Sequence, residues 1–134
     1  MKLTFIDSGV LMAAFRGTGR EGDLALELLD DREREFASSI FVMLETLPKT
    51  EFFEREQERR FYQRFFRDIS KWATIDVELT ESAFHIASAA GLAAIDALHL
   101  AAAHQTQCEE FVTTEKHTKP IHRTNLMAIK TIHS

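Results

Sequence analysis

Four carboxylates occur in this sequence where their neighbours are largely apolar. Asp7 follows the run LTFI, Glu45 follows IFVML, Asp96 lies within AAIDALHLAAA, and Glu115 follows FVTT. Burying an ionised carboxylate is costly unless it is paired with a cation or coordinates a metal. No Lys or Arg lies within ten residues of Asp96 on either side. The four acids therefore suggest a site for a hard cation, since Mg²⁺ and Mn²⁺ prefer oxygen ligands.

The chemistry of such a site is phosphodiester cleavage. Two cations about 4 Å apart can activate a water and hold the leaving oxygen. Each acid alone also has an ordinary interpretation. Asp7 could cap a helix, Asp96 could be a first-turn acid favoured by the helix dipole, Glu45 could lie on an exposed stripe, and Glu115 could be a loop residue. The cation site is favoured only if all four reach the same place.

The secondary-structure pattern would bring them there. Short apolar segments predict strands, and amphipathic or capped segments predict helices. The predicted strands are residues 2–6, 36–37, 72–77, 111–113 and 127–132. The predicted helices are residues 10–15, 23–31, 40–47, 50–69, 81–90 and 94–104. Strands that alternate with helices imply a parallel sheet covered on both faces, with ligands bound at the carboxyl edge of the strands. Asp7 and Glu115 should both reach that edge.

Local signals set several of these boundaries. Ser38-Ser39 is expected to offer the cap of the helix at 40–47, and Pro48 is expected to end it. Thr80 is expected to cap the helix at 81–90, and Gly91 to end it.

Composition limits the function classes. The chain has 134 residues, 45% of them hydrophobic, which suits one domain with one core. Its net charge of −5 argues against a protein that holds nucleic acid by bulk positive charge, but not against a nuclease whose acidic site binds cations. No apolar stretch approaches the roughly 18 residues of a membrane span. With its single cysteine, Cys108, these features lead us to expect a cytoplasmic protein that does not enter the membrane.

The histidines form no recognisable metal motif. His99 and His104 are five residues apart, as are His117 and His122, and neither spacing puts two imidazoles on one helix face. We interpret His99 as a core or rim residue.

The helix predicted at 50–69 is rich in aromatic and basic residues. Its phenylalanines are Phe52, Phe53, Phe61, Phe65 and Phe66. Most of this surface should pack in the core, and a surplus would form a groove for a partner helix or a dimer contact. Its arginines could contact RNA phosphates or an acidic partner, or pair with the neighbouring glutamates, which is the interpretation we favour.

Four segments in order resemble the PIN-domain family. They are FIDSGVLMAAF, SSIFVMLETLPK, GLAAIDALHLAAA and FVTTEKH. The third is the closest match, because a helix of this family begins with Asp-Ala and continues with small and apolar residues. The length of the chain resembles the VapC-type toxins of bacterial and archaeal toxin–antitoxin pairs.

The resemblance implies a three-layer α/β/α sandwich with a central, mostly parallel sheet, in a single domain over residues 1–134. It also implies a ribonuclease that depends on Mg²⁺ or Mn²⁺, an antitoxin that covers the active site, and a homodimer. Asp7, Glu45 and Asp96 match the family's metal-binding acids. Glu115 stands at the fourth position, where the family usually has Asp.

Two further residues are expected to orient groups at this site without binding the metal themselves. Thr113 matches the family's threonine and would orient a ligand or water, and Ser8 would do the same on the Asp7 side.

Three functions remain open at this stage. The first is a toxin endoribonuclease that cleaves RNA with a metal-activated water. The second is a non-catalytic PIN-like binding module with a degenerate acidic site. The third is a related nuclease of structured DNA, for which 134 residues leave little room for additional duplex-gripping helices.

Overall fold

A computed structural model describes residues 1–134. It contains a five-stranded sheet, six α-helices and one 3₁₀ helix. The strands are β1 (Lys2–Ile6), β2 (Arg34–Ser38), β3 (Lys71–Trp72), β4 (Glu110–Thr113) and β5 (Ala128–Thr131). The helices are α1 (Ser8–Arg16), α2 (Gly19–Asp30), α3 (Ile40–Phe52), α4 (Glu56–Arg67), α5 (Val77–Ala90), α6 (Ala94–Gln105) and the 3₁₀ helix η1 (Pro120–Arg123).

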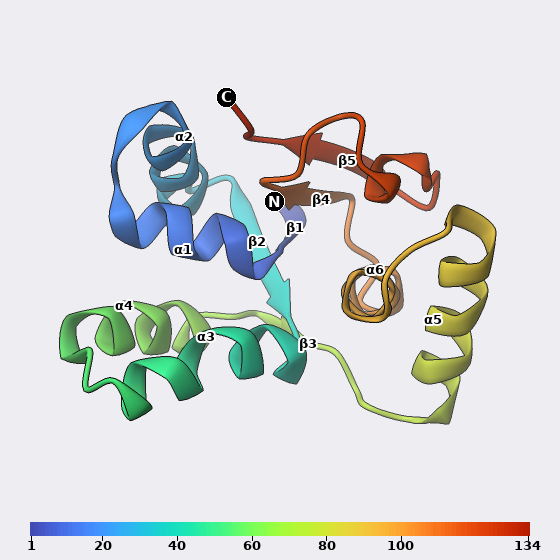
Figure 1. Cartoon of the computed structure of the whole chain (residues 1–134), viewed down its shortest axis with the longest axis horizontal. Coiled ribbons are helices and arrows are strands. Elements are labelled where there is room, and N and C mark those ends of the chain that lie inside the picture. Colours follow the sequence, from blue (N-terminus) through green and yellow to red (C-terminus); the bar gives the residue numbers. More distant parts are fainter.

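The sheet is parallel throughout, in the order β3-β2-β1-β4-β5. Figure 1 shows α1 and α2 on one side of the sheet and α5 and α6 on the other. The predicted α/β/α sandwich is confirmed, and its sheet is wholly parallel. β1 lies at the centre, between β2 and β4, so its carboxyl end lies at the middle of the carboxyl edge of the sheet.

The core explains why these segments fold as they do. Phe5 on β1 and Phe111 on β4 are fully buried and stack with ring centroids 5.5 Å apart. α6 is buried along most of its length, and its buried residues include the small side chains of Ala101, Ala102 and Ala103. No helix is by itself long and apolar enough to span a membrane, and α5 and α6 meet that criterion only when joined across a 118° bend.

Pro48 does not end α3 as predicted, since the helix continues to Phe52. A proline inside a helix removes one backbone hydrogen bond. Val42 and Thr50, on either side of Pro48, are both buried. Packing of this helix against the core therefore outweighs the lost bond.

The single helix predicted at 50–69 is also wrong, because the chain turns between α3 and α4. Glu54 has φ 55° and occupies the left-handed region. The N–H of Arg55 donates to the carbonyl of Thr50 at 2.8 Å, and that of Glu54 donates to Glu51 at 3.2 Å. This bond pair is a Schellman motif, which usually places Gly at the left-handed position. Here Glu54 takes that position, so the sequence carried no glycine signal.

The boundary between β3 and α5 lies earlier than predicted. Asp76 caps α5, because its carboxylate accepts from the N–H of Leu79 at 2.8 Å. Thr80 instead lies inside the helix and donates to the carbonyl of Val77. The strand predicted at 72–77 is therefore reduced to Lys71–Trp72, while Gly91 ends α5 in the left-handed conformation as expected.

Candidate active site

Asp7 directly follows the carboxyl end of β1, at the centre of that edge of the parallel sheet. Its backbone N–H donates to the carbonyl of Val112 on β4 at 3.1 Å, which extends the ladder by one residue. One carboxylate oxygen, Oδ1, accepts from the N–H of Val10 at 3.1 Å and caps α1. The other oxygen, Oδ2, accepts from the hydroxyl of Thr113 at 2.5 Å. Asp7 is thus both a helix cap and a fixed carboxylate at the carboxyl edge of the sheet.

Thr113 connects Asp7 to Glu115. Its hydroxyl oxygen, which donates to Asp7, accepts from the backbone N–H of Glu115 at 3.1 Å. Thr113 is fully buried at the end of β4, and Glu115 follows it at the same edge of the sheet. The Thr113 side chain therefore links the carboxylate of Asp7 to the backbone of Glu115.

Glu45 comes to the site from α3, and two donors hold the same oxygen of its carboxylate. Ser8 Oγ donates to Oε1 at 2.8 Å, and His99 Nε2 lies 2.6 Å from that atom. The hydrogen bond from His99 is the main reason that the pKa of Glu45 is lowered. Ser8 was expected to support the Asp7 side, but it contacts Glu45 instead.

Asp96 lies in the first turn of α6, which ordinarily favours an acid. Burial nevertheless raises its pKa, and the negative charges of Glu115 and Glu45 raise it further. Burial also raises the pKa of Asp7 to about 6 against its two hydrogen bonds, and the charge of Asp96 contributes to the increase. Asp96 is therefore close enough to the other three acids for their charges to interact.

No Lys or Arg is among the groups that shift the pKa of Asp7 or Asp96. Partly buried carboxylates that repel one another and form no ion pair with Lys or Arg favour the binding of a cation from solution. The donor set, all carboxylate oxygen, fits Mg²⁺ or Mn²⁺. No three Asp, Glu, His or Cys side chains converge closely enough to hold a metal ion by themselves. A bound ion would keep several waters, as Mg²⁺ usually does.

His99 is the site residue that sequence reasoning missed. It was interpreted as a core or rim residue, and it is indeed only 2% exposed. Its imidazole, however, contacts Glu45. The available signal was its position three residues after Asp96, which places both side chains on one face of α6.

Comparison with known proteins identifies the class. The PIN domain family matches the sequence over residues 4–122. The chain therefore belongs to the PIN-domain family, and the resemblance of its motifs is confirmed. The matched span includes all four acids. Comparison with curated proteins found no match.

Solved structures with the same fold are toxin–antitoxin complexes. VapBC2 from Rickettsia felis, bound to a DNA fragment from its promoter, has a TM-score of 0.71 and 12% identity, covering 96% of this chain and 98% of that one. A toxin–antitoxin complex from Klebsiella pneumoniae has a TM-score of 0.71 and 17% identity, covering 97% and 98%. DNA-bound VapBC from Salmonella typhimurium has a TM-score of 0.71 and 12% identity, covering 98% and 99%. The fold thus matches over nearly the full length of each chain.

Proposed function

We propose that this protein is a metal-dependent endoribonuclease, the VapC-type toxin of a type II toxin–antitoxin pair. The observation that carries the proposal is Asp7, which follows the carboxyl end of β1, has one carboxylate oxygen held by Thr113 and forms no ion pair with Lys or Arg. Burial also raises the pKa of this carboxyl to about 6. Membership of the PIN family supports the same conclusion. The substrate would be RNA, the protein would act in the cytoplasm, and residues 1–134 would form a single PIN domain.

Asp7, Glu45, Asp96 and Glu115 would hold Mg²⁺ or Mn²⁺. A divalent cation supplies Lewis-acid chemistry for the attack of water on a phosphodiester bond. Thr113 keeps Asp7 Oδ2 in one orientation, and Ser8 does the same for Glu45 Oε1. Asp96 approaches from the first turn of α6 and Glu45 from α3, while Asp7 lies between β1 and α1 as the cap of α1. Rigid elements of this kind hold ligands more accurately than loops do.

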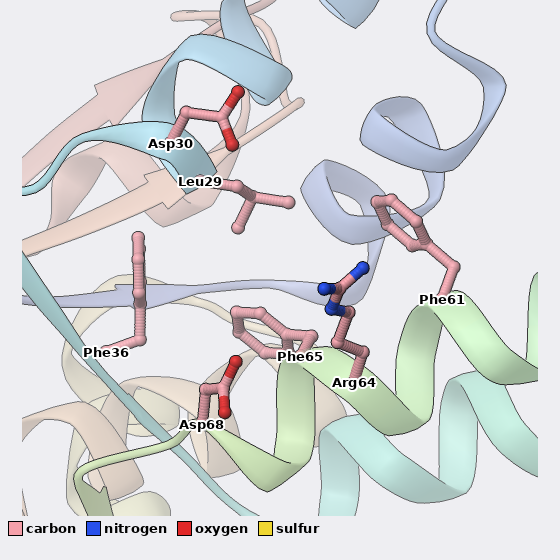
Figure 2. Close-up of a pocket in the computed structure, with 7 residues that line it drawn as sticks. All are labelled: Leu29, Asp30, Phe36, Phe61, Arg64, Phe65 and Asp68. Carbon is pink, nitrogen blue, oxygen red and sulfur yellow. The ribbon is translucent and has the colours of Figure 1, made fainter.

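The hollow between α2 and α4 supports an antitoxin partner. Its volume is about 460 Å³, and it is lined by Leu29, Asp30, Phe36, Phe61, Arg64, Phe65 and Asp68. Figure 2 shows the three phenylalanine rings and Leu29 around the hollow, with charged side chains near it. An apolar groove with a charged rim suits an amphipathic helix. We place the antitoxin helix there.

The aromatic residues of α4 form two groups, and the proposal gives each group a separate role. Tyr62 and Phe66 are buried in the core, whereas Phe61 and Phe65 line the hollow. Phe52 and Phe53 remain 80% and 56% exposed, and with Leu44 on α3 they offer apolar surface for a homodimer.

A non-catalytic binding module is the second candidate. The observation that favours it is that no three candidate ligands converge on one point. Under this alternative the acids are remnants, and the protein binds its partner without cleaving RNA.

Cleavage of bulk cellular RNA and transfer RNA by the purified protein would decide between the two. Reactions would contain Mn²⁺, Mg²⁺ or EDTA and would compare the wild type with Asp96→Asn. The nuclease should cleave with either metal, lose cleavage in EDTA, and lose it in the variant. Folded wild-type protein, freed of any partner, that cleaves in neither metal would support the binding module. Cleavage that survives Asp96→Asn would indicate a contaminant or another site. Co-purification with the product of a neighbouring reading frame would test the antitoxin separately.

A further inference from the structure

His99 has the geometry of a residue that acts through another. It lies on α6 and is only 2% exposed, so its imidazole does not reach solvent. Its one polar contact is Glu45 Oε1, 2.6 Å from Nε2. Its other nitrogen, Nδ1, is buried and has no hydrogen-bond partner. An N–H at Nδ1 would lack an acceptor, so the surroundings favour the tautomer that carries its proton on Nε2 and donates it to Glu45.

The contact between His99 and Glu45 determines which oxygen of the Glu45 carboxylate is available to bind a cation. Ser8 and His99 both bind Oε1, and neither binds Oε2. Glu45 is otherwise a long side chain on α3, and its neighbour Leu44 is 60% exposed. Without these two donors the carboxylate could rotate toward solvent. With them, one oxygen is fixed and the other is left for a cation.

We propose that His99 is a positioning residue: by holding Oε1 of Glu45 across the interface of α3 and α6, it presents Oε2 to the divalent cation. This inference rests on the proposed function, because it assumes that Glu45 is a metal ligand. Partners that orient a ligand in this way typically change metal affinity or activity by roughly 10- to 100-fold when removed.

A purely structural histidine would behave differently. His99 also packs near Phe5, with ring centroids 6.1 Å apart, and its bond to Glu45 joins two helices. If that were its whole role, its removal would lower the melting temperature and leave the metal affinity of the folded protein unchanged. Metal binding therefore separates the two roles where stability does not.

The experiment is titration of Mn²⁺ into the purified protein by calorimetry, with melting temperature measured on the same samples. The central pair is His99→Gln and His99→Asn. Gln can place an amide N–H near the position of Nε2, whereas Asn is one methylene too short. His104→Asn, exposed on the same helix, is the matched control. We expect Mn²⁺ affinity to fall at least 10-fold in His99→Asn, to stay within about 3-fold of wild type in His99→Gln, and to be unchanged in His104→Asn.

The outcomes separate this inference from the proposed function. Wild-type protein that binds Mn²⁺, beside a folded His99→Asn that binds it equally well, would overturn the positioning role and leave the metal site standing. Folded wild-type protein that binds no Mn²⁺ would overturn the proposed function and the positioning role together. If His99→Asn does not fold, His99→Leu takes its place, since it removes the donor and keeps a side chain of similar bulk. Weak binding by His99→Leu beside wild-type binding by His99→Gln would support the proposal, and equal binding by all three would contradict it.

Discussion

Asp7 and Glu110 are carboxylates on neighbouring parallel strands, at opposite ends of the sheet. Asp7 follows the carboxyl end of β1, and Glu110 begins β4 at the amino end. Glu110 is 1% exposed, yet its carboxylate bonds to Arg34 and Lys130 at 2.8 Å and to the hydroxyl of Thr4 at 2.9 Å. Burial alone would raise the pKa of Glu110, but these bonds lower it to about 2. The pKa of Asp7 is instead raised to about 6 by burial.

The difference separates a structural charge from a functional one. The amino edge of the sheet supplies its own cations and neutralises its acid. The carboxyl edge collects several acids, none of which forms an ion pair with Lys or Arg, and this leaves much of their repulsion to be relieved by something that binds. Perturbed carboxylates occur in both settings, and the pKa of Glu45 is lowered as that of Glu110 is, so the identity of the neighbouring groups distinguishes the two settings better than the sign of the shift.

Asp7→Asn should give the largest effect, and it should be on activity. Removing one cation ligand should reduce cleavage of RNA by roughly 100-fold or more. Stability should stay within about 1 kcal/mol of wild type, because Asn keeps an oxygen to cap α1 and no longer buries a charge. Cleavage kinetics and urea unfolding on one preparation would test both statements. A large loss of stability would mean that Asp7 is chiefly a structural cap.

Glu110→Gln should show the reverse pattern. Arg34 and Lys130 would lose a charged partner at a buried position, which should destabilise the protein by about 2–3 kcal/mol. Activity of the folded fraction should stay within about 2-fold, because Glu110 lies at the other end of the sheet. The same two assays apply, and a variant that unfolds like wild type would contradict the structural role of this cluster.

The pH dependence of the free energy of unfolding should reflect the protonation of Glu110. The pKa of Glu110 in the folded protein, about 2, lies below the ordinary value of 4.5 that applies to an unfolded chain. A lowered folded pKa gives stability that is complete above the unfolded value and is lost as the pH falls through the folded value. The gap in stability between wild type and Glu110→Gln should therefore narrow between pH 4.5 and pH 2. Urea unfolding at intervals across this range would measure it, and a constant gap would show that the charge of Glu110 is not the cause.

The sequence was sufficient to predict the central part of this arrangement. The strand at 2–6, the helix that carries Asp96 and the strand that ends at Thr113 were all predicted close to their observed positions. Each has a strong local signal, either a short apolar run or a long run of small apolar residues. Because parallel strands align their carboxyl ends, the meeting of Asp7 and Glu115 at one edge followed from these signals alone.

What the sequence did not reveal depends on contacts between distant segments. The bond between His99 and Glu45 joins residues 54 positions apart, and neither residue's neighbours indicate it. No sequence pattern singled out Glu110, because its partners Arg34 and Lys130 come from two other strands. Pairings of this kind require the register of the sheet, which no local pattern specifies.

Lys2→Gln should give the smallest effect of these variants, and it tests which cations stabilise the Glu110 carboxylate. Lys2 Nζ lies 3.7 Å from the Glu110 carboxylate, and its side chain is 42% exposed. Exposed ion pairs contribute about 0.2–1 kcal/mol, and the closer Arg34 and Lys130 would remain. We expect a loss of about 0.5 kcal/mol or less in urea unfolding, with activity unchanged. Lys130→Gln, which removes a partner at 2.8 Å, is the matched comparison and should cost more. A Lys2→Gln variant as unstable as Glu110→Gln would show that the amino edge depends on its most distant cation. The contrast with Asp7 would then rest on a screened surface charge rather than on a buried cluster.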